Sequence, residues 1–272
     1  GIPVFSYIPP SAWAWRKGRA KSCAALADEI VAIFPHELPP YEAAGANISF
    51  VGNPLIDTVH AEMEPEEARI HFGIRAEDVP ILLMPGSRRE EIERLLPPML
   101  DAAEILAAED PARRFFLPVA GGVDVTQIEG HLAVSSVTVT LTHDARYALM
   151  GIARAAIAAS GTVVMEAAIM GLPAVILYRM SALSYFVGRL LVDVPRFSLP
   201  NILVGETFET ELLQDEVQPE RIAEAMERII ADGADRAYVM DCLARAVAKL
   251  GEPNAARRVA EKILALARTS ET

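Results

Sequence analysis

Several features that would place the chain in a specialised class are scarce or missing. Cysteine occurs twice in 272 residues, at the distant positions Cys23 and Cys242, which suits a reducing compartment and leaves no metal or redox motif. The longest stretch without a charged side chain is 1–15, which contains three prolines and is shorter than the roughly 18 apolar residues of a membrane span. No basic segment precedes it, so a signal peptide is not predicted.

Basic charge is also scarce. The chain has 25 Lys and Arg against 37 Asp and Glu, a net charge of −12, which argues against a nucleic-acid partner bound through a basic face. Residues 111–204 alone are slightly positive, with a net charge of +2. This excess hints at an anion site, although acidic, helix-rich flanks around a buried sheet explain the same pattern equally well.

Common catalytic motifs are missing as well. The sequence contains no Walker-type glycine loop, no G-x-G-x-x-G and no G-x-S-x-G elbow. Its five histidines show no H-E-x-x-H spacing, and no Asp-x-Asp pair is present for a divalent ion. Serine-hydrolase and metal-dependent chemistry are therefore poorly supported, and no metal or cofactor is expected.

What is present is an ordinary globular composition, 52% hydrophobic and 23% charged, long enough for one large domain or two modest ones. Apolar runs alternate with helical patterns, which predicts an α/β fold with parallel strands. Strands are expected at 4–8, 29–34, 48–51, 80–84, 115–119, 137–141, 155–159 and 174–178. Helices are expected at 17–26, within 60–79, from 89 onward, at 145–153, 163–170 and 183–191, and three times in the last 55 residues. Pro97 and Pro98 predict a kink or a break in the helix that begins at 89.

The first informative strand–turn–helix junction is 82–90. Gly86 lets the backbone approach a ligand closely, Ser87 is a good helix cap, and Arg88 can hold two phosphate oxygens. A helix N-terminus supplies free N–H groups and partial positive charge, which favours a phosphate. A capped turn with a solvated arginine is the alternative interpretation.

The second junction combines Ser160, Gly161 and Thr162 with Glu166 one turn further along the helix. A carboxylate among apolar residues is costly unless it is paired, and two adjacent ribose hydroxyls would satisfy it. Glu166 at the solvent edge of the helix is the alternative. Ligands of open α/β sheets bind beyond the carboxyl ends of the strands, so both junctions predict one site for a nucleoside diphosphate.

Two later segments carry weaker signals. Arg179 and Asn201 each follow a short apolar run, and Glu211 and Gln214 follow at the spacing of one helical turn. A surface role is the default for each of them. Basic residues within 16–21 beside Trp13 and Trp15 could face anionic lipid, as could the apolar stretch 186–191, but a solvated helix face and core packing are the respective alternatives.

Five strings of this sequence together resemble the bacterial lipid-A-disaccharide synthase family. They are 7–16 (YIPPSAWAWR), 84–92 (MPGSRREEI), 159–162 (ASGT), 198–203 (SLPNIL) and 211–214 (ELLQ). The resemblance implies a GT-B glycosyltransferase with Rossmann-like parallel sheets. Such an enzyme moves 2,3-diacylglucosamine from its UDP derivative to 2,3-diacylglucosamine 1-phosphate, with inversion and without metal, giving the β-1,6-linked disaccharide 1-phosphate and UDP.

The resemblance also implies a role for each matching residue. The diphosphate would be held by Gly86, Ser87 and Arg88, with Ser160, Gly161 and Thr162 lining the same pocket and Glu166 binding the ribose. Arg179, Asn201, Glu211 and Gln214 are further candidates for nucleotide contacts. The acylated substrates imply a cytoplasmic protein, peripheral on the inner-membrane surface, and a homodimer is an arrangement left open.

The chain departs from the family pattern in places. Gly52-Asn53-Pro54 stands where the family has Gly-His-Pro, and Pro9 stands in place of serine. Family members carry about a hundred further residues before the position of Gly1, so we expect an N-terminally truncated chain that transfers no sugar alone. The predicted domains are 1–59, the remnant of an N-terminal acceptor domain, 60–250, a complete UDP-binding domain, and 251–272, a helix that packs back on the first.

The general base is expected outside this chain, and Asp57 and Asp144 are no more than possibilities within it. Two alternatives stay open at this point. One is another GT-B enzyme that uses UDP-N-acetylglucosamine, such as a MurG-like transferase or a 2-epimerase. The other is a non-catalytic nucleotide-binding module.

Overall fold

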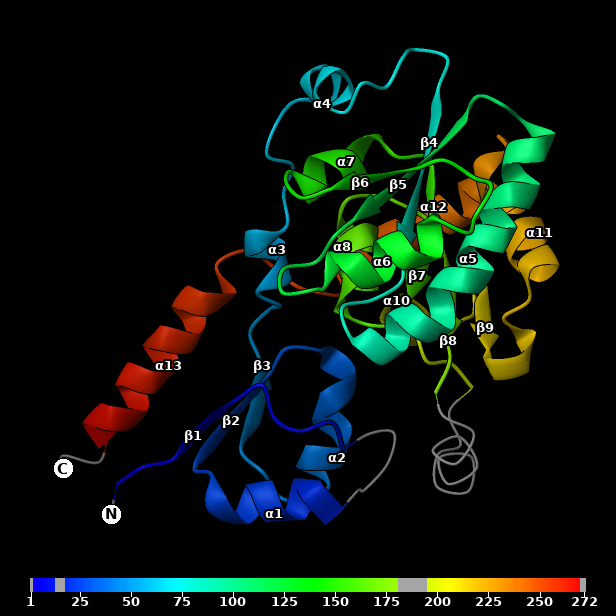
Figure 1. Ribbon diagram of the computed structural model, residues 1–272. Helices are drawn as coiled ribbons and strands as arrows, with labels where there is room; N and C mark the ends of the chain where they lie inside the picture. The colour runs from blue at the N-terminus through cyan, green and yellow to red at the C-terminus, as the bar shows by residue number, and fades with distance from the viewer. Residues whose placement is uncertain (1, 13–17, 181–194, 270–272) are drawn as a thin grey trace. The chain divides into compact units, whose positions relative to one another are not determined.

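The computed structural model describes residues 2–12, 18–180 and 195–269, and the chain divides into two compact units. Unit 1 comprises residues 1–58, 185–195 and 247–272, and unit 2 comprises 59–184 and 196–246. Figure 1 shows both units with their helices and strands labelled. The tryptophan-containing stretch 13–17 and the predicted helix at 183–191 lie outside the described residues.

Unit 2 is built on a six-stranded parallel sheet in the order β6-β5-β4-β7-β8-β9. The strands are β4 (Val79–Met84), β5 (Arg113–Pro118), β6 (Val139–Thr142), β7 (Ala155–Ala159), β8 (Ala174–Tyr178) and β9 (Glu211–Leu213). From β4 the chain adds strands in one direction, and from β7 it adds them in the other. The topological switch point therefore lies between β4 and β7, the place where open α/β sheets bind ligands.

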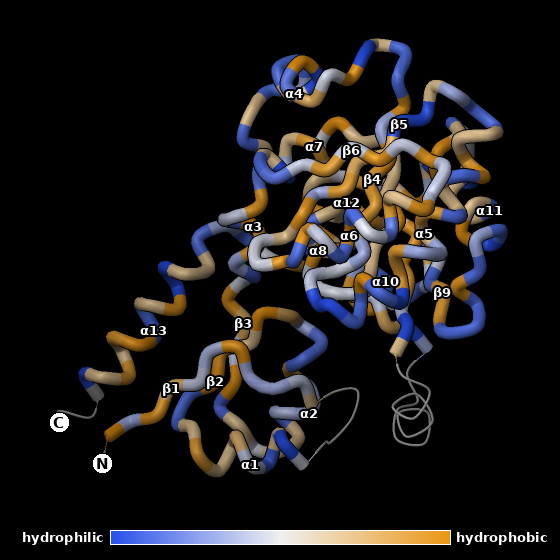
Figure 2. The backbone as a smooth tube through the Cα atoms, viewed as in Figure 1, coloured by the Kyte–Doolittle hydropathy of each residue, from blue (hydrophilic) through white to orange (hydrophobic). Residues whose placement is uncertain are grey.

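Helices cover both faces of this sheet, because successive side chains of a strand point to opposite faces. On one face Leu82, Phe116 and Ile176 form a core cluster with Leu149 and Val164 from the helices. The helices of unit 2 are α4 (Pro65–His71), α5 (Arg89–Glu109), α6 (Val125–Leu132), α7 (Arg146–Ile152), α8 (Thr162–Ile169), α10 (Leu199–Val204), α11 (Pro219–Ile230) and α12 (Ala234–Ala248), with a 3-10 turn at Gln214–Glu216. Figure 2 shows hydrophobic residues concentrated along the strands and hydrophilic ones on the outer helices and loops.

The long helix α5 runs without interruption through Pro97 and Pro98, so the predicted break into two helices is wrong. Proline removes the N–H that would bond to the carbonyl four residues earlier, which for Pro98 is the carbonyl of Arg94. The guanidinium of Arg179 donates to that carbonyl at 3.4 Å. Leu95, Leu96 and neighbouring residues of the helix are buried, so tertiary packing outweighs the local cost of proline.

Several further elements differ from the sequence prediction, among them α6 and β9. Helix α6 was not anticipated, although Asp124 caps it by accepting the N–H of Thr126 at 3.1 Å. Glu211 lies in strand β9 and Gln214 in the turn that follows, so their spacing is not that of a helix.

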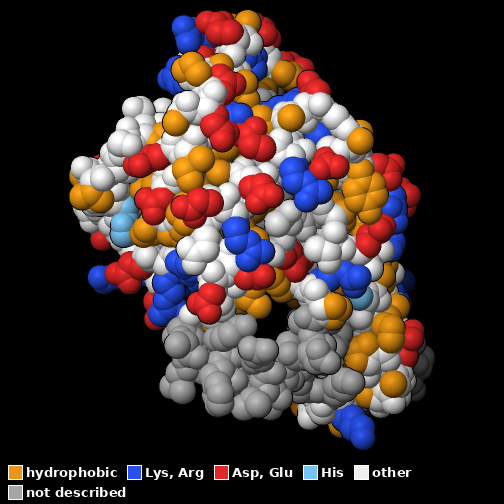
Figure 3. All heavy atoms as spheres, turned by 90° about the vertical axis from the view of Figure 1, so that its right-hand side faces the viewer, with side chains coloured by type: hydrophobic (Ala, Val, Ile, Leu, Met, Phe, Trp, Pro, Cys, Tyr) orange, Lys and Arg blue, Asp and Glu red, His pale blue; other side chains and the backbone are white. Residues whose placement is uncertain are grey.

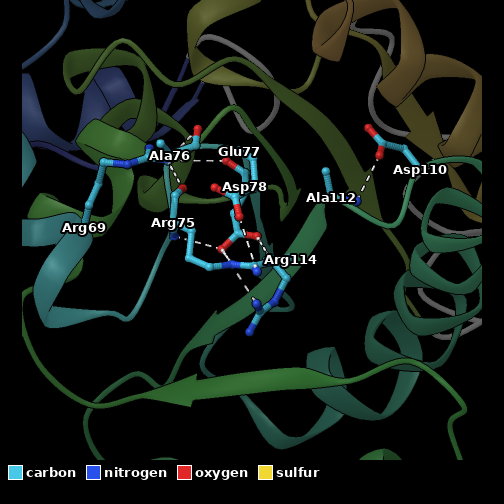
Figure 4. A network of polar contacts seen from close by, with 8 residues as sticks. All are labelled: Arg69, Arg75, Ala76, Glu77, Asp78, Asp110, Ala112 and Arg114. Carbon is cyan, nitrogen blue, oxygen red and sulfur yellow. Dashed lines mark hydrogen bonds and ion pairs between the residues drawn. The ribbon is translucent and has the colours of Figure 1, made fainter.

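At the amino end of β4, Asp78 is buried in a network of basic residues, shown in Figure 4. Its carboxylate accepts the backbone N–H of Arg75 at 2.8 Å and the guanidinium of the same residue at 3.0 Å, and Arg114 lies 3.7 Å away. These hydrogen bonds from Arg75 hold the pKa of Asp78 below its usual range. The network fixes the turn that enters β4, at the edge of the sheet opposite the switch-point site.

Unit 1 contains a three-stranded parallel sheet, β1 (Phe5–Tyr7), β2 (Glu29–Ala32) and β3 (Ile48–Phe50), in that order. Its helices are α1 (Gly18–Leu26), α2 (Leu38–Glu42), α3 (Leu55–Thr58) and α13 (Ala255–Thr269), with a 3-10 turn at Pro35–Glu37. Ile30 and Tyr41 are central to a small core. Asn53 is fully buried: its amide donates to the Ile33 carbonyl and accepts from Leu55 N, both at 2.9 Å, so it has a structural role.

The face drawn in Figure 3 carries acidic and basic side chains interspersed with scattered hydrophobic ones, the pattern of a solvated surface. Among the described residues, no helix combines the length and the apolar character that spanning a membrane requires.

Candidate functional site

A cleft of about 360 Å³ lies at the carboxyl ends of β4 and β7, on the switch point of unit 2. Both predicted junctions contribute to its wall. Seven of the predicted site residues line it: Gly86, Ser87, Arg88, Ser160, Gly161, Thr162 and Glu166. The topology explains why, because the strands before the two junctions are neighbours in the sheet although about 75 residues separate them in sequence.

The first wall is the loop between β4 and α5. The N–H groups of Ser87 and Arg88 both point to the carboxylate of Glu91, with N···O distances of 3.3 Å each. The guanidinium of Arg88 donates to the same carboxylate at 2.9 Å. Gly86 has a φ of +103°, and a Cβ added there would collide with the Glu91 carboxylate. Three donors thus converge on one negative group, the carboxylate of Glu91.

The second wall is the start of α8. Thr162 is its first residue, and no acidic residue occupies its first turn, so its N-terminal N–H groups present positive charge. Gly161 has a φ of 176°, an extended conformation open to any residue. The hydroxyl of Ser160 donates to the Phe197 carbonyl at 3.4 Å, which ties this turn to the segment before α10.

Glu166 lies one turn further along α8, with its side chain only 12% exposed. Burial raises the pKa of this carboxyl above its ordinary value, and the nearby Arg146 lowers it. Arg146, at the start of α7, is 3.3 Å from the Glu166 carboxylate and lines the same cleft. Sequence reasoning missed Arg146. Its position just after a strand, in the slightly basic 111–204 region, was the signal that could have found it.

The other four predicted residues do not line this cleft. Asn201 is fully buried, and its amide donates to Glu209 O at 2.9 Å and to the Glu211 carboxylate at 2.7 Å. Glu211 also accepts the N–H groups of Phe197 and Ser198. Gln214 accepts the N–H of Met180 at 3.2 Å.

Arg179, the fourth of these residues, donates to the carbonyls of Gln214 and Val217 at 3.1 and 2.7 Å. The four therefore belong to a hydrogen-bonded cluster around β8 and β9. Their contacts to a nucleotide stay a prediction.

The two candidate bases have other partners. The Asp57 carboxylate accepts the N–H groups of Asn254 and Ala255 at 2.6 and 3.0 Å, so it caps α13 within unit 1. Asp144 pairs with His71 at 3.4 Å and is largely exposed. It lines a smaller hollow beside the cleft, together with Thr142 and Arg146. Neither carboxylate lines the cleft itself.

Comparison with solved structures supports the fold. UDP-GlcNAc 2-epimerase from Neisseria meningitidis, bound to UDP-GlcNAc, superposes with a TM-score of 0.65 and 16% identity, covering 97% of this chain and 70% of its own. A UDP-N-acetylglucosamine 2-epimerase assigned in Listeria monocytogenes gives the same TM-score at 17% identity, over 99% of this chain and 69% of its own. At such identities the likeness is one of fold, and it confirms the α/β, GT-B type architecture.

Sequence comparison is more specific. The family model described as lipid-A-disaccharide synthetase matches residues 2–265. The chain is 41% identical over 272 residues to lipid-A-disaccharide synthase of Syntrophus aciditrophicus (strain SB), covering 71% of that protein. It is 41% identical over 264 residues to the enzyme of the same name from Geobacter metallireducens, covering 97% of this chain and 69% of that protein. These matches set aside the MurG-like and epimerase alternatives, and the chain belongs to the lipid-A-disaccharide synthase family, glycosyltransferases of lipid A biosynthesis.

Proposed function

We propose that the switch-point cleft binds the UDP moiety of a UDP-2,3-diacylglucosamine donor, whose sugar is transferred to 2,3-diacylglucosamine 1-phosphate. The observation that carries the proposal is the convergence, in one cleft, of two helix N-termini, the Arg88 guanidinium and the largely buried Glu166 carboxylate. A nucleoside diphosphate presents the complementary groups, two phosphates for the donors and two adjacent ribose hydroxyls for the carboxylate.

In the reaction, the acceptor hydroxyl gives its proton to a general base and forms a bond to the anomeric carbon, while the bond from that carbon to the UDP oxygen breaks. Negative charge develops on the departing diphosphate. The N–H groups of Ser87 and Arg88, the start of α8 and the Arg88 guanidinium are fixed donors that stabilise this charge. Because Glu91 occupies two of these N–H groups, its side chain must rotate away as the diphosphate enters.

Glu166 supports the proposal from the ribose side. An ionised carboxylate has only acceptor sites, so it can take both ribose hydroxyls at once. Its position one turn into α8 places it beyond the phosphate-binding start of the same helix. In this arrangement the diphosphate and the ribose of UDP would lie at the two ends of one helical turn.

The proposal assigns no general base to a described residue of the cleft. Among the described residues that line the cleft, the carboxylates are Glu91 and Glu166, and both have other roles in it. We therefore expect the 272-residue chain to bind UDP and to form no disaccharide. Incubation with donor and acceptor, followed by mass spectrometry of the products, checks this, and turnover would show that the chain holds a complete catalytic set.

The donor and the acceptor both carry acyl chains, so we expect the enzyme to act at a membrane surface. The proposal therefore includes peripheral attachment to the cytoplasmic face of the inner membrane. A homodimer stays an open arrangement. Flotation with anionic vesicles tests the attachment. Recovery of the chain only in the protein fraction, at low salt, would contradict it.

Titration calorimetry with UDP tests the nucleotide site. Replacing Arg88 with alanine should weaken UDP binding about ten-fold or more, because a hydrogen bond to a charged group is worth roughly 1.5–3 kcal/mol. Uridine lacks the phosphates and should bind both proteins equally. Equal UDP affinity of the two proteins would contradict the assignment of Arg88.

A further inference from the structure

Arg146 is a cleft residue that the proposed UDP site does not yet use. It is the first residue of α7, and its Nη2 atom lies 3.4 Å from Oε1 and 3.3 Å from Oε2 of Glu166 on α8. Among the ion pairs of the described residues, Arg146 is the cation that reaches Glu166. The pair joins two helices that follow different strands, β6 and β7, so neither local sequence nor helix spacing creates it.

The backbone and neighbouring side chains hold Arg146 in this place. Ala145, just before it, adopts a left-handed conformation with φ 45° and ψ 40°, which is uncommon outside glycine and costs energy. The Arg146 guanidinium lies 4.6 Å above the Tyr147 ring and donates to the Tyr147 hydroxyl at 2.6 Å. Glu62 accepts the N–H of Ala148 at 2.8 Å and so fixes the first turn of α7. Arg146 therefore lies on a strained turn whose conformation is fixed by hydrogen bonds.

We infer that Arg146 is a positioning residue for ribose recognition: it holds the Glu166 carboxylate ionised and facing the cleft, so that the site selects ribonucleotides over 2′-deoxyribonucleotides. This inference rests on the proposed UDP site. Its chemical reason is that an ionised carboxylate accepts two hydroxyl protons, whereas a protonated one has lost part of that capacity and donates instead. Burial without a cation beside the carboxyl shifts its equilibrium toward the protonated form.

The charges that face Glu166 come from the starts of two helices. Arg146 projects from α7, and Arg88 and Glu91 line the cleft from the start of α5, where they pair with each other at 2.9 Å. Arg88 is thus engaged with Glu91, while Arg146 acts on Glu166 directly. Burial raises the pKa of Glu166 and Arg146 opposes that rise, so loss of Arg146 should move the protonation of Glu166 to higher pH.

The test compares the affinities for UDP and 2′-deoxy-UDP, by calorimetry, between pH 5 and 8. Taking the ratio of the two affinities cancels the titration of the diphosphate itself. The wild-type chain should prefer UDP about ten-fold or more, because the deoxy ligand lacks one hydroxyl that bonds to a charged group. Arg146→Gln should lower the ratio and move the pH at which it falls to a higher value.

Four further proteins make the result specific. Glu166→Gln should lose the preference at every pH, and the Arg146→Gln/Glu166→Gln double variant should lose no more. Arg146→Lys keeps the positive charge and should return the pH midpoint toward that of the wild type. Arg228→Gln is the matched control: it removes an exposed arginine that pairs with Asp235 at 2.8 Å on another face of unit 2, and it should leave the ratio unchanged.

An Arg146→Gln protein with the wild-type ratio and pH midpoint would overturn the inference. Equal weakening of UDP and 2′-deoxy-UDP would also overturn it, since Arg146 would then contact another part of the nucleotide. If the wild-type chain binds no UDP, the proposed function itself fails and the inference falls with it. A wild-type chain that binds UDP but ignores the 2′-hydroxyl would instead contradict only the ribose role of Glu166 and Arg146.

Discussion

At the scale of single residues, the most informative side chain is Glu91. Its carboxylate takes the N–H groups of Ser87 and Arg88 and the Arg88 guanidinium, the donors that the proposed diphosphate would use. Glu91 is therefore a competitor of the ligand as well as a cap of α5. Gly86 is explained by its backbone, because a φ of +103° strains any other residue, and a Cβ there would also meet the Glu91 carboxylate.

Replacing Glu91 with glutamine should raise the affinity for UDP several-fold, because the neutral amide competes less well for the N–H groups and releases Arg88. Calorimetry with UDP measures the change, with uridine as the ligand that does not reach these donors. Glu90→Gln is the matched control: it removes the same charge from the preceding position, where the side chain is exposed and pairs with Arg94. Weaker UDP binding by the Glu91 variant alone would show that this carboxylate assists the ligand.

Glu209 is a second residue with a measurable consequence. It is 2% exposed, its Oε1 accepts the N–H of Ala174 at 2.9 Å, and its Oε2 has no hydrogen-bond partner among the described residues. Burial, with the charge of Glu211 nearby, raises its pKa to about 8. The folded state therefore holds this proton more tightly than the unfolded state, and stability falls as pH rises from about 4.5 to 8.

Glu209→Gln should remove that part of the pH dependence, because the amide cannot ionise and still accepts the Ala174 N–H. The variant should match the wild type near pH 5 and melt at a temperature several degrees higher at pH 8 to 9. Thermal unfolding followed by circular dichroism across this range is the measurement. Parallel melting curves of the two proteins at every pH would show that Glu209 does not titrate in this window.

At the scale of elements, the sequence predicts the two junctions of the cleft well, because glycine, serine and arginine directly after a buried strand indicate a strand–turn–helix junction from neighbouring residues alone. It predicts α5 less well. Pro97 and Pro98 indicate a kink or a break, but the partner of the freed Arg94 carbonyl is Arg179, 85 residues further along the chain. The sequence does not reveal the role of Arg146 either, because its partner Glu166 is also distant in sequence and the two meet only through the order of the strands.

Arg179→Met tests whether that arginine supports the fold or contacts the ligand. It donates to the carbonyls of Arg94, Gln214 and Val217, so its loss should lower the unfolding free energy by about 1–3 kcal/mol. Urea unfolding gives this value, and calorimetry gives the UDP affinity of the same protein. Reduced stability with unchanged affinity indicates a structural role, and reduced affinity at unchanged stability would indicate the nucleotide contact predicted from sequence.

At the scale of the whole chain, the two units have separate sheets and separate cores, and the cleft residues all belong to unit 2. A ligand stabilises only those states in which its site is intact. If the units open independently, UDP should slow amide exchange in unit 2 and leave unit 1 unaffected.

Hydrogen exchange with mass spectrometry can read this difference in one experiment. Saturating UDP should protect peptides that contain 85–91 and 160–166, whereas peptides from β2 and α13 should exchange as before. Glu166→Gln, with weaker ribose contacts, should show less protection at the same UDP concentration. Equal protection of β2 and α13 would mean that the chain opens as one cooperative body rather than as two independent units.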